Sequence, residues 1–358
     1  MRRALLACSL FASLLILPGG RVAAASAHGH LETLTIHAAA LEGNSSGEPT
    51  EQPLAVYLPP SYEQEPGRRF PVLYLLHGIG DTYTTWTEDE GIVAILDDLF
   101  AGRPQDELIV VLPNGRTHLL GSFYANSPIT GRWEDFVTAD LVRFIDQRFR
   151  TLADAGHRGL GGHSMGGFGA LRLSMRHPDV FSVAYAMSPC CLDFDQDLGQ
   201  ANFAWLKTLA FRDRGDVERT LADARSVSDV YPVALLALAQ VVTPNAASPL
   251  GADLPLRQER GELLPIDDLY ARWQEFFPLA EAGRSRSQLT RLRAIAIDYG
   301  IDDQFAHIPS GAARYSQELA RLRIPHTLDA YQGDHRKLIQ QRLREVVLPF
   351  FIRRLRAR

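Results

Sequence analysis

The sequence is poor in cysteine, and this scarcity excludes a disulfide framework. Three of the 358 residues are cysteines, and Cys8 lies in an apolar N-terminal segment. The remaining pair, Cys190 and Cys191, is adjacent in the chain and cannot cross-link distant segments. We expect two free thiols there rather than a strained vicinal disulfide. The sequence also lacks a C-x-x-C motif and a histidine cluster, so nothing points to a metal, and we expect no cofactor.

The sequence also lacks a net positive charge and, beyond its N-terminus, long apolar runs. The formal net charge is −5, and a mildly acidic protein gives no reason to expect a nucleic-acid partner. Beyond residue 27 no run is long and apolar enough to cross a membrane, so we expect no stable membrane insertion. Hydrophobic residues make up 46% of the chain and charged residues 22%, which is ordinary for a globular protein. No internal repeat is present, and nothing indicates an oligomeric state.

The N-terminus has the three parts of a secretory signal peptide. Met1-Arg2-Arg3 is basic, residues 4–17 form a short apolar core, and Ala25-Ser26-Ala27 matches the small-residue cleavage signal. The apolar core is too short to span a bilayer comfortably. We therefore expect residues 1–27 to be removed. The mature protein, residues 28–358, is expected to be a single domain exported to the periplasm or the extracellular space.

The most informative motif is Gly162-His163-Ser164-Met165-Gly166. It lies between an extended, glycine-containing segment and a helix-forming run, which is the strand–turn–helix context of a nucleophile elbow. Side chains at Gly162 and Gly166 would collide with the neighbouring strand and helix. The tight turn strains Ser164 and lifts its hydroxyl clear of the sheet, beside the N-terminus of the following helix. We predict that Ser164 is a catalytic nucleophile.

A serine nucleophile needs a base, and three histidines follow it at a useful distance. In folds with this elbow the order along the chain is serine, acid, histidine. His326 stands in an alternating segment typical of a strand and is expected on its flank. His307 follows the acid candidates too closely to fold back onto the serine. His335 lies in the turn after that strand, at the strand end where ligand sites form in open α/β sheets. We predict His335 as the base.

The acid is expected near the end of the preceding strand. Residues 292–298 form a nearly continuous apolar run, as a buried parallel strand requires. Asp298 still belongs to this run, whereas Asp302 and Asp303 lie in the loop beyond it. Composition does not separate these two loop residues, and an aspartate in such a place is also typical of a turn or a helix cap.

An oxyanion intermediate needs two backbone N–H donors. We expect one from Met165, directly after the nucleophile, and one from Ile79, in the glycine-containing loop after the strand at residues 71–76. His77 in that loop is expected to brace it by hydrogen bonding. Candidate substrate contacts, which are small or aromatic residues near these loops, are Gly78, Phe123 and Tyr124, with Trp86 and Trp133 as further candidates for an apolar cavity.

Six segments resemble one family of α/β-hydrolases, the esterase family that includes S-formylglutathione hydrolases, feruloyl esterases and mycobacterial mycolyltransferases. They are LLHGIG at 75–80, VVLPNG at 110–115, SFYANS at 122–127, WEDF at 133–136, GHSMGG at 162–167 and GIDDQF at 300–305. Together they fall within residues 50–195 and 290–355. The resemblance implies the α/β-hydrolase fold. It also implies that the acid is the fourth residue of the glycine-led loop, Asp303, and that the histidine turn is Gly333-Asp334-His335.

The strand pattern agrees with a doubly wound, mostly parallel sheet. Two antiparallel strands are expected first, at residues 31–39 and 53–58. Further strands are expected to alternate with helical stretches, including one at residues 134–149, in the rhythm of βαβ units. These strands are at residues 71–76, 107–112, 157–163, 181–187, 292–298 and 325–331.

Residues 194–290 interrupt that rhythm. The segment contains six prolines, among them Pro232, with short helical stretches at residues 203–211 and 269–277. A connection of this length is usually functional or carries its own structure. We expect a helical lid over the site, and a peripheral decoration is the alternative.

The leading hypothesis is a serine esterase acting on a small-molecule ester. Ser164 attacks the ester carbonyl, His335 transfers the proton, and Asp303 orients the imidazole. An acyltransferase would use the same residues with an alcohol or sugar in place of water, and the sequence does not separate the two. A non-catalytic binding protein of this fold would be expected to lose a triad member, and none is lost. The ester itself is not identified by the sequence.

Overall fold

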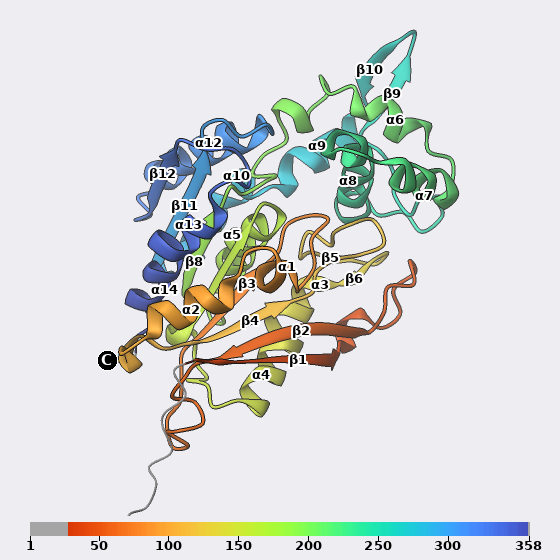
Figure 1. Ribbon diagram of the computed structural model, residues 1–358. Helices are drawn as coiled ribbons and strands as arrows, with labels where there is room; N and C mark the ends of the chain where they lie inside the picture. Colours follow the sequence, from red (N-terminus) through yellow and green to blue (C-terminus); the bar gives the residue numbers. More distant parts are fainter. Residues whose placement is uncertain (1–27, 357–358) are drawn as a thin grey trace, which may run out of the picture.

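The computed structural model describes residues 28–356, so the predicted signal peptide lies outside the described residues. Its centre is an eight-stranded sheet in the order β1-β2-β4-β3-β7-β8-β11-β12 (Figure 1). The first two strands pair antiparallel with each other, and β2 pairs antiparallel with β4. All the remaining neighbours are parallel. The strands are β1 (His30–His37), β2 (Glu51–Leu58), β3 (Val72–Leu76), β4 (Ile109–Pro113), β7 (Arg158–His163), β8 (Val183–Met187), β11 (Ala294–Gly300) and β12 (Thr327–Tyr331).

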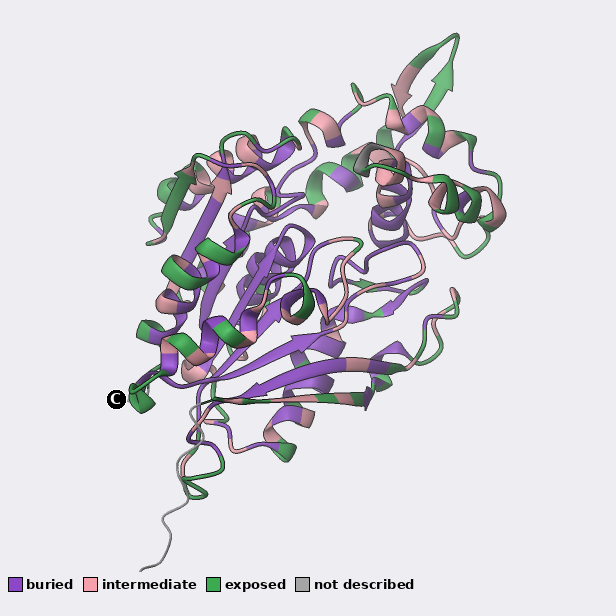
Figure 2. Cartoon of the chain, in the orientation of Figure 1, coloured by how far each residue is buried: buried purple, intermediate pink, exposed green. Residues whose placement is uncertain are grey.

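Every strand predicted for this sheet is present. Both ends of each strand lie within two residues of their predicted positions. The central strands are buried on both faces (Figure 2), as expected where helices cover a parallel sheet on both sides. In β3 the side chains of Leu73 and Leu75 join one core cluster, and Val72, Tyr74 and Leu76 join another. The two-residue repeat of a strand therefore divides the core into two layers.

Helices pack on both faces of the sheet. One core cluster joins it to α2 (Ile92–Phe100) and to the C-terminal helices α13 (Ile339–Arg342) and α14 (Leu348–Leu355). On the opposite face lie α5 (Met165–Arg176) and α12 (His307–Arg321). The helix expected at residues 134–149 is present as a continuous run of α3 (Trp133–Asp135), a π-helical turn over Phe136–Leu141, and α4 (Val142–Arg148). A short helix, α1 (Thr85–Glu88), precedes α2.

The insertion at residues 194–290 lies at one end of the sheet (Figure 1). It is helical, as expected, but it also contains an unpredicted hairpin. Pro232, one of the six prolines of this segment, lies inside the longest helix of the insertion, and its carbonyl accepts a hydrogen bond from Thr208 Oγ1 at 3.1 Å. The elements are α6 (Ala204–Ala210), α7 (Arg214–Asp223), α8 (Val227–Val242), β9 (Leu256–Glu259), β10 (Glu262–Pro265), α9 (Asp267–Phe276), α10 (Pro278–Ala282) and α11 (Arg286–Leu289).

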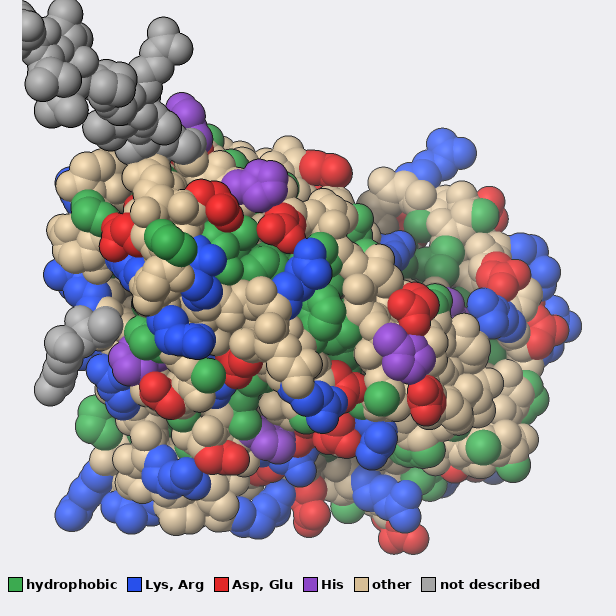
Figure 3. Space-filling view, turned by 90° about the horizontal axis from the view of Figure 1, so that it is seen from below, with side chains coloured by type: hydrophobic (Ala, Val, Ile, Leu, Met, Phe, Trp, Pro, Cys, Tyr) green, Lys and Arg blue, Asp and Glu red, His purple; other side chains and the backbone are tan. Residues whose placement is uncertain are grey.

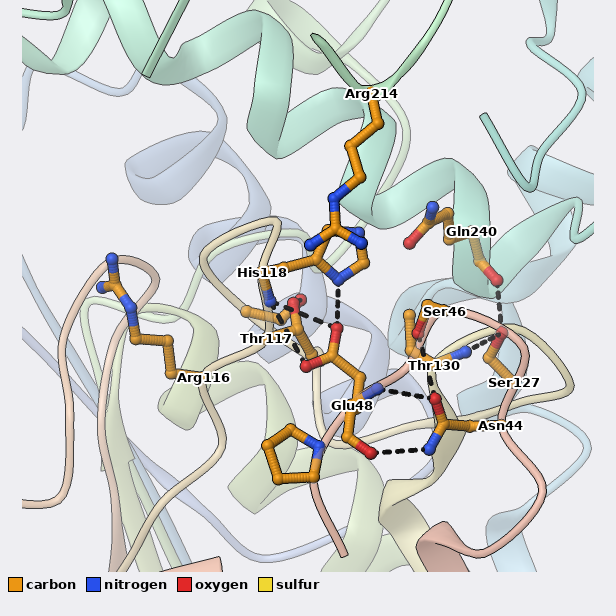
Figure 4. A network of polar contacts seen from close by, with 12 residues as sticks. Asn44, Ser46, Glu48, Arg116, Thr117, His118, Ser127, Thr130, Arg214 and Gln240 are labelled. Atoms are coloured by element: carbon orange, nitrogen blue, oxygen red, sulfur yellow. Dashed lines mark hydrogen bonds and ion pairs between the residues drawn. The ribbon is translucent and has the colours of Figure 1, made fainter. Parts of the chain in front are cut away.

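A polar network joins the insertion to the rest of the domain (Figure 4). Ser127, in the small hairpin of β5 (Asn126–Ser127) and β6 (Gly131–Arg132), donates its hydroxyl hydrogen to the carbonyl of Gln240 in α8 at 2.5 Å. Beside this contact Glu48 accepts hydrogen bonds from the backbone and the ring of His118. A cavity of about 240 Å³ lies here, between the loops that hold these residues and helices α7 and α8.

Charged side chains of both signs lie on the surface, and the helices are short or polar. On the face shown in Figure 3, acidic and basic side chains are interspersed. Within residues 28–356, the helices are all too short or too polar to cross a membrane.

Candidate active site

The predicted nucleophile elbow is present. Ser164 connects β7 to α5 with φ 56° and ψ −116°, a conformation that residues with a side chain rarely adopt. Two backbone hydrogen bonds hold it there. The Ser164 amide donates to the Met187 carbonyl at 2.9 Å, and the Ser164 carbonyl accepts from the Cys190 amide at 3.2 Å. These two bonds fix the serine to the end of β8 and to the loop that follows that strand.

The two motif glycines are required by close backbone contacts. A Cβ atom on Gly166 would lie 2.1 Å from the carbonyl oxygen of Leu76 at the end of β3. On Gly162 it would lie 2.4 Å from the backbone of Gly166. Atoms without a covalent bond between them do not approach so closely, so neither position accepts a side chain. These are the collisions with strand and helix that the sequence predicts.

His335 and Asp303 form a buried pair beside this serine. His335 Nδ1 lies 2.7 Å from Asp303 Oδ2. The other carboxylate oxygen, Oδ1, accepts the Phe305 amide at 2.9 Å, so both oxygens have a partner. Because a carboxylate faces Nδ1, that nitrogen carries the proton and Nε2 is left as the acceptor. Ser164 and His335 line the same cavity. The structure thus places the predicted base in contact with the predicted acid, and the predicted nucleophile and base in one cavity.

The other two acid candidates do not contact His335. Asp298 is buried on β11, where it accepts the Tyr185 hydroxyl at 2.8 Å and the Arg342 Nη2 at 2.7 Å. Burial raises the pKa of the Asp298 carboxyl, although Arg342 and Tyr185 oppose this effect. Asp302 is exposed and accepts a hydrogen bond from the side chain of Gln332. Asp298 therefore lies in the core of the sheet, and Asp302 lies on the surface.

The structure corrects one prediction about the remaining histidines. His326 lies away from the cavity, as expected, and its Nε2 contacts Ser316 Oγ at 2.7 Å. The expectation that His307 cannot reach the site is wrong. His307 begins α12, is buried, and lines the same cavity as Ser164. It is held there by Asp197, a residue of the insertion, whose Oδ1 lies 2.8 Å from His307 Nδ1. The spacing of residues in the sequence does not predict this contact between His307 and Asp197.

A third histidine, His163, was not predicted to have any role. It is the second residue of the elbow motif, and its Nε2 donates to the backbone carbonyl of His335 at 2.8 Å. The two imidazole rings lie 4.5 Å apart. Burial lowers the pKa of His163 well below its usual value, so the ring stays neutral and can hold the His335 loop. Only its place beside Ser164 in the sequence pointed to this contact.

The candidate oxyanion donors lie at the ends of two neighbouring elements. Met165 is the first residue of α5, where a backbone N–H has no partner within its own helix. Ile79 lines the cavity in the loop after β3. His77 braces that loop as predicted, because its Nε2 accepts the Gly115 amide and its Nδ1 donates to the Gly78 carbonyl, both at 2.8 Å. Burial lowers the pKa of His77 to about 4.

The cavity has a volume of about 560 Å³. Of the candidate substrate contacts, Gly78 and Phe123 line it. Tyr124 does not, since it is buried beneath the loop and donates its hydroxyl hydrogen to the His77 carbonyl at 3.0 Å. Trp86 and Trp133 are also core residues away from the cavity. The insertion supplies much of the apolar wall: Leu198, Val230, Tyr231, Ala234, Leu235 and Leu238.

The insertion therefore borders the cavity, and its action as a lid stays a prediction. Cys190 and Cys191 also line the cavity and are buried free thiols, as expected. Among the residues that the structure describes, no cluster of histidine, cysteine and carboxylate side chains could hold a metal ion.

Several known proteins resemble this chain in sequence and in fold. The model of a family described as Putative esterase matches residues 45–338. An esterase of Mycobacterium tuberculosis, Rv1288, is 38% identical over 137 residues, which are 37% of this chain and 28% of that protein. The S-formylglutathione hydrolase of Paracoccus denitrificans is 29% identical over 173 residues, or 43% of this chain and 58% of that protein. The chain thus spans well under two thirds of the length of these relatives.

A solved ferulic acid esterase superimposes with a TM-score of 0.61 at 22% identity, covering 91% of this chain and 98% of the other. This likeness shows the predicted α/β-hydrolase fold.

Proposed function

The chain belongs to this esterase family, and from that premise we propose that it hydrolyses carboxylic esters through an acyl-enzyme formed on Ser164. The observation that carries the proposal is the 2.7 Å contact between His335 Nδ1 and Asp303 Oδ2, in a cavity that Ser164 also lines. A nucleophile, a base and a carboxylate that orients the base are the parts that acyl transfer requires.

Each part has a definite task in the proposed reaction. The Ser164 oxygen attacks the ester carbonyl while His335 Nε2 takes the hydroxyl proton, and Asp303 stabilises the imidazolium that forms. The backbone N–H groups of Met165 and Ile79 bind the negative oxygen of the tetrahedral intermediate. His335 then gives its proton to the leaving alcohol. A water molecule, activated by the same histidine, releases the acid and restores the serine.

The cavity favours an ester with an apolar acyl group. Its wall on α8 is built from aliphatic side chains, among them Ala234, Leu235 and Leu238, and Phe123 lies on the core side. A cavity of about 560 Å³ falls in the range that encloses a small organic ligand. We infer that the acyl chain lies against α8, so that longer acyl groups bury more surface and react with a higher kcat/KM.

The test is turnover of p-nitrophenyl esters from acetyl to octanoyl, together with labelling by a fluorophosphonate. Ser164→Ala should lower kcat by at least about 10⁴-fold and abolish labelling. Ser174→Ala is a matched control, because Ser174 is a buried serine of α5, the helix that Ser164 precedes, and its hydroxyl has no hydrogen-bond partner within residues 28–356. It should keep both turnover and labelling. Labelling of the Ser164→Ala protein at the wild-type level would refute the proposal.

An acyltransferase on the same residues is the second candidate. The apolar wall on α8 favours it, because a cavity that excludes water lengthens the life of an acyl-enzyme and lets another acceptor compete. The two candidates are separated by adding an alcohol or a sugar and measuring both products. Free acid as the main product supports hydrolysis, whereas a transferred ester that dominates at millimolar acceptor identifies a transferase.

We further propose that the protein is exported after cleavage behind Ala27. In support, the backbone amide of Gly29 donates to Asp97 at 2.7 Å and β1 begins at His30, so cleavage there leaves the contacts of the domain intact. N-terminal sequencing of the protein recovered outside the cytoplasm should begin at His28. Recovery of the protein with Met1 still present, and only inside the cells, would refute export.

A further inference from the structure

A second nucleophile lies in the same cavity with its own histidine and carboxylate. Cys190 and His307 both line the cavity beside Ser164, and His307 contacts Asp197. The two sets are neighbours. The Cys190 amide donates to the Ser164 carbonyl at 3.2 Å. Between the two histidines lies Phe305, with ring centroids 5.0 Å from His335 and 6.1 Å from His307.

The His307 ring is held in one orientation. Asp197 Oδ1 accepts the His307 backbone amide at 2.7 Å and contacts Nδ1 at 2.8 Å, while Tyr231 donates its hydroxyl hydrogen to Asp197 Oδ2 at 3.2 Å. Because Nδ1 faces a carboxylate, Nε2 is the nitrogen that can accept a proton. That atom is buried and has no hydrogen-bond partner among the described residues. Cys190 lines the same cavity as His307, and it is the thiol with which His307 interacts electrostatically.

The two adjacent thiols differ in pKa because their surroundings differ. Burial would raise the pKa of both, but contacts with Cys191 and His307 hold the pKa of Cys190 at about 7. Burial and the neighbouring Cys190 raise the pKa of Cys191 well above its usual value. For His307, burial is outweighed by Asp197 and Cys190, which raise its pKa to about 9. A proton therefore passes readily from Cys190 to His307, and Cys191 keeps its own.

We propose that Cys190 is a thiol modification site that reacts with small apolar disulfides, with His307 as its proton acceptor, and that the adduct blocks the Ser164 site. The Cys190 thiol gives its proton to His307 Nε2, and the thiolate attacks one sulfur of the disulfide. The sulfur–sulfur bond breaks, a Cys190 mixed disulfide forms, and the leaving thiolate takes the proton from His307. One disulfide and one protein thiol thus yield one mixed disulfide and one small thiol.

The adduct is expected to stop ester turnover because of where Cys190 lies. Its side chain shares the cavity with Ser164, and the backbones of the two residues are hydrogen bonded. A group attached to Cys190 occupies the space that the acyl group of an ester would take. A small thiol reductant should remove the group and restore activity. This consequence for turnover rests on the proposed esterase function, whereas the reactivity of Cys190 does not.

The adjacent cysteine provides a matched control. Two full-length proteins are compared, both carrying Cys8→Ser: Cys191→Ser retains only Cys190, and Cys190→Ser retains only Cys191. Each is mixed with dithiodipyridine at about pH 7, and the rate of thiopyridone release is measured. The protein that retains Cys190 should react at least about tenfold faster, because far more of its thiol is ionised. Its mass should gain one pyridylthio group, and this gain should be reversed by dithiothreitol.

A further change tests the role of His307. In the protein that retains only Cys190, His307→Gln should lower the rate of thiopyridone release by about tenfold. Equal rates for the two single-cysteine proteins, or a faster reaction at Cys191, would overturn the proposal. So would an unchanged rate in a folded His307→Gln protein. If that variant does not fold, the two cysteine variants decide alone.

Turnover is followed in parallel. The protein with Cys190 should lose activity in step with labelling, and the protein without it should keep its own untreated activity. Absence of turnover before treatment would refute the esterase and leave the labelling result unaffected. Labelling of Cys190 with full retention of turnover would overturn the proposed block of the site.

Discussion

The assignment of Asp303 as the acid can be tested by a change of one atom. In Asp303→Asn the side chain remains buried and similar in shape, but one oxygen becomes an NH2 group. The Phe305 amide donates to Oδ1, so the oxygen of the asparagine is held on that side. The NH2 group then faces His335 Nδ1, which in the parent residue contacts Oδ2 at 2.7 Å. Nδ1 must accept, the proton moves to Nε2, and His335 can no longer take the proton of Ser164.

The magnitude follows from this change of tautomer. In serine proteases the corresponding substitution lowers kcat by about 10⁴. We expect kcat to fall by about 10² to 10⁴, or roughly 3 to 5 kcal/mol at the transition state. Stability should change by only about 1 kcal/mol, because the bond from Phe305 persists, a neutral hydrogen bond replaces the one between Asp303 and His335, and no cavity is formed. The assay is steady-state turnover of a p-nitrophenyl ester, with thermal melting of the same preparations.

Asp302→Asn is the control, since Asp302 is exposed and contacts Gln332 rather than a histidine. Its kcat should stay within about tenfold of the wild type. The reverse pattern, a large loss in Asp302→Asn and a small one in Asp303→Asn, would refute the assignment. Small losses in both would refute a catalytic carboxylate in this loop.

Three further predictions concern the elbow, the bracing loop and the cavity wall. Gly166→Ala places a Cβ atom 2.1 Å from the Leu76 carbonyl oxygen and should lower the free energy of unfolding in denaturant by about 3 kcal/mol. Gly67→Ala is the control, because nothing lies within 4 Å of its added Cβ atom. It should change the free energy of unfolding by less than about 0.5 kcal/mol. His77 has a pKa of about 4 when folded, below its unfolded value of 6.5, so its contribution to stability is complete above pH 6.5 and is lost as the pH falls towards 4. Between about pH 7 and 5 the free energy of unfolding should therefore fall by about 2 kcal/mol less in His77→Gln than in the wild type. An unchanged pH dependence would contradict a neutral buried ring. Ala234→Trp should lower kcat/KM for an octanoyl ester by about tenfold relative to an acetyl ester, and an equal effect on both would place the acyl group elsewhere.

The sheet and the elbow were predictable because their signals are local. Each strand is a short apolar run, and a buried parallel strand needs no partner in the sequence to be recognised. The strained turn at Ser164 requires small residues at fixed positions, so the motif alone predicts that the backbone packs closely at Gly162 and Gly166. The choice of Asp303 over Asp302 depended on the register of a known loop, since two adjacent aspartates have the same local chemistry.

The insertion was predicted less well, for physical reasons. In α8 the residues from Val233 to Ala239 are buried except for Ala234, so the apolar run has no polar face and shows no helical period. Pro232 suggested a break, but the helix begins at a capping box of Ser226 and Asp229, and packing holds it through the proline. His307 was misjudged because its partner, Asp197, is 110 residues away. Contacts of this kind depend on tertiary packing, which residue spacing does not record.

Two different parts of the chain build the cavity, one carrying the candidate catalytic residues and the other carrying much of the apolar wall. The triad residues are carried by loops at the ends of sheet strands, whereas much of the apolar wall is carried by α8. Ser127 ties the C-terminal half of this helix to the domain through the Gln240 carbonyl. If α8 binds the acyl group as proposed, the acyl preference can be changed by exchanging this helix alone. A chimera that keeps Ser127 and receives a different wall in place of residues 227–239 should acquire a new preference for acyl length while its rate of acyl-enzyme chemistry stays the same.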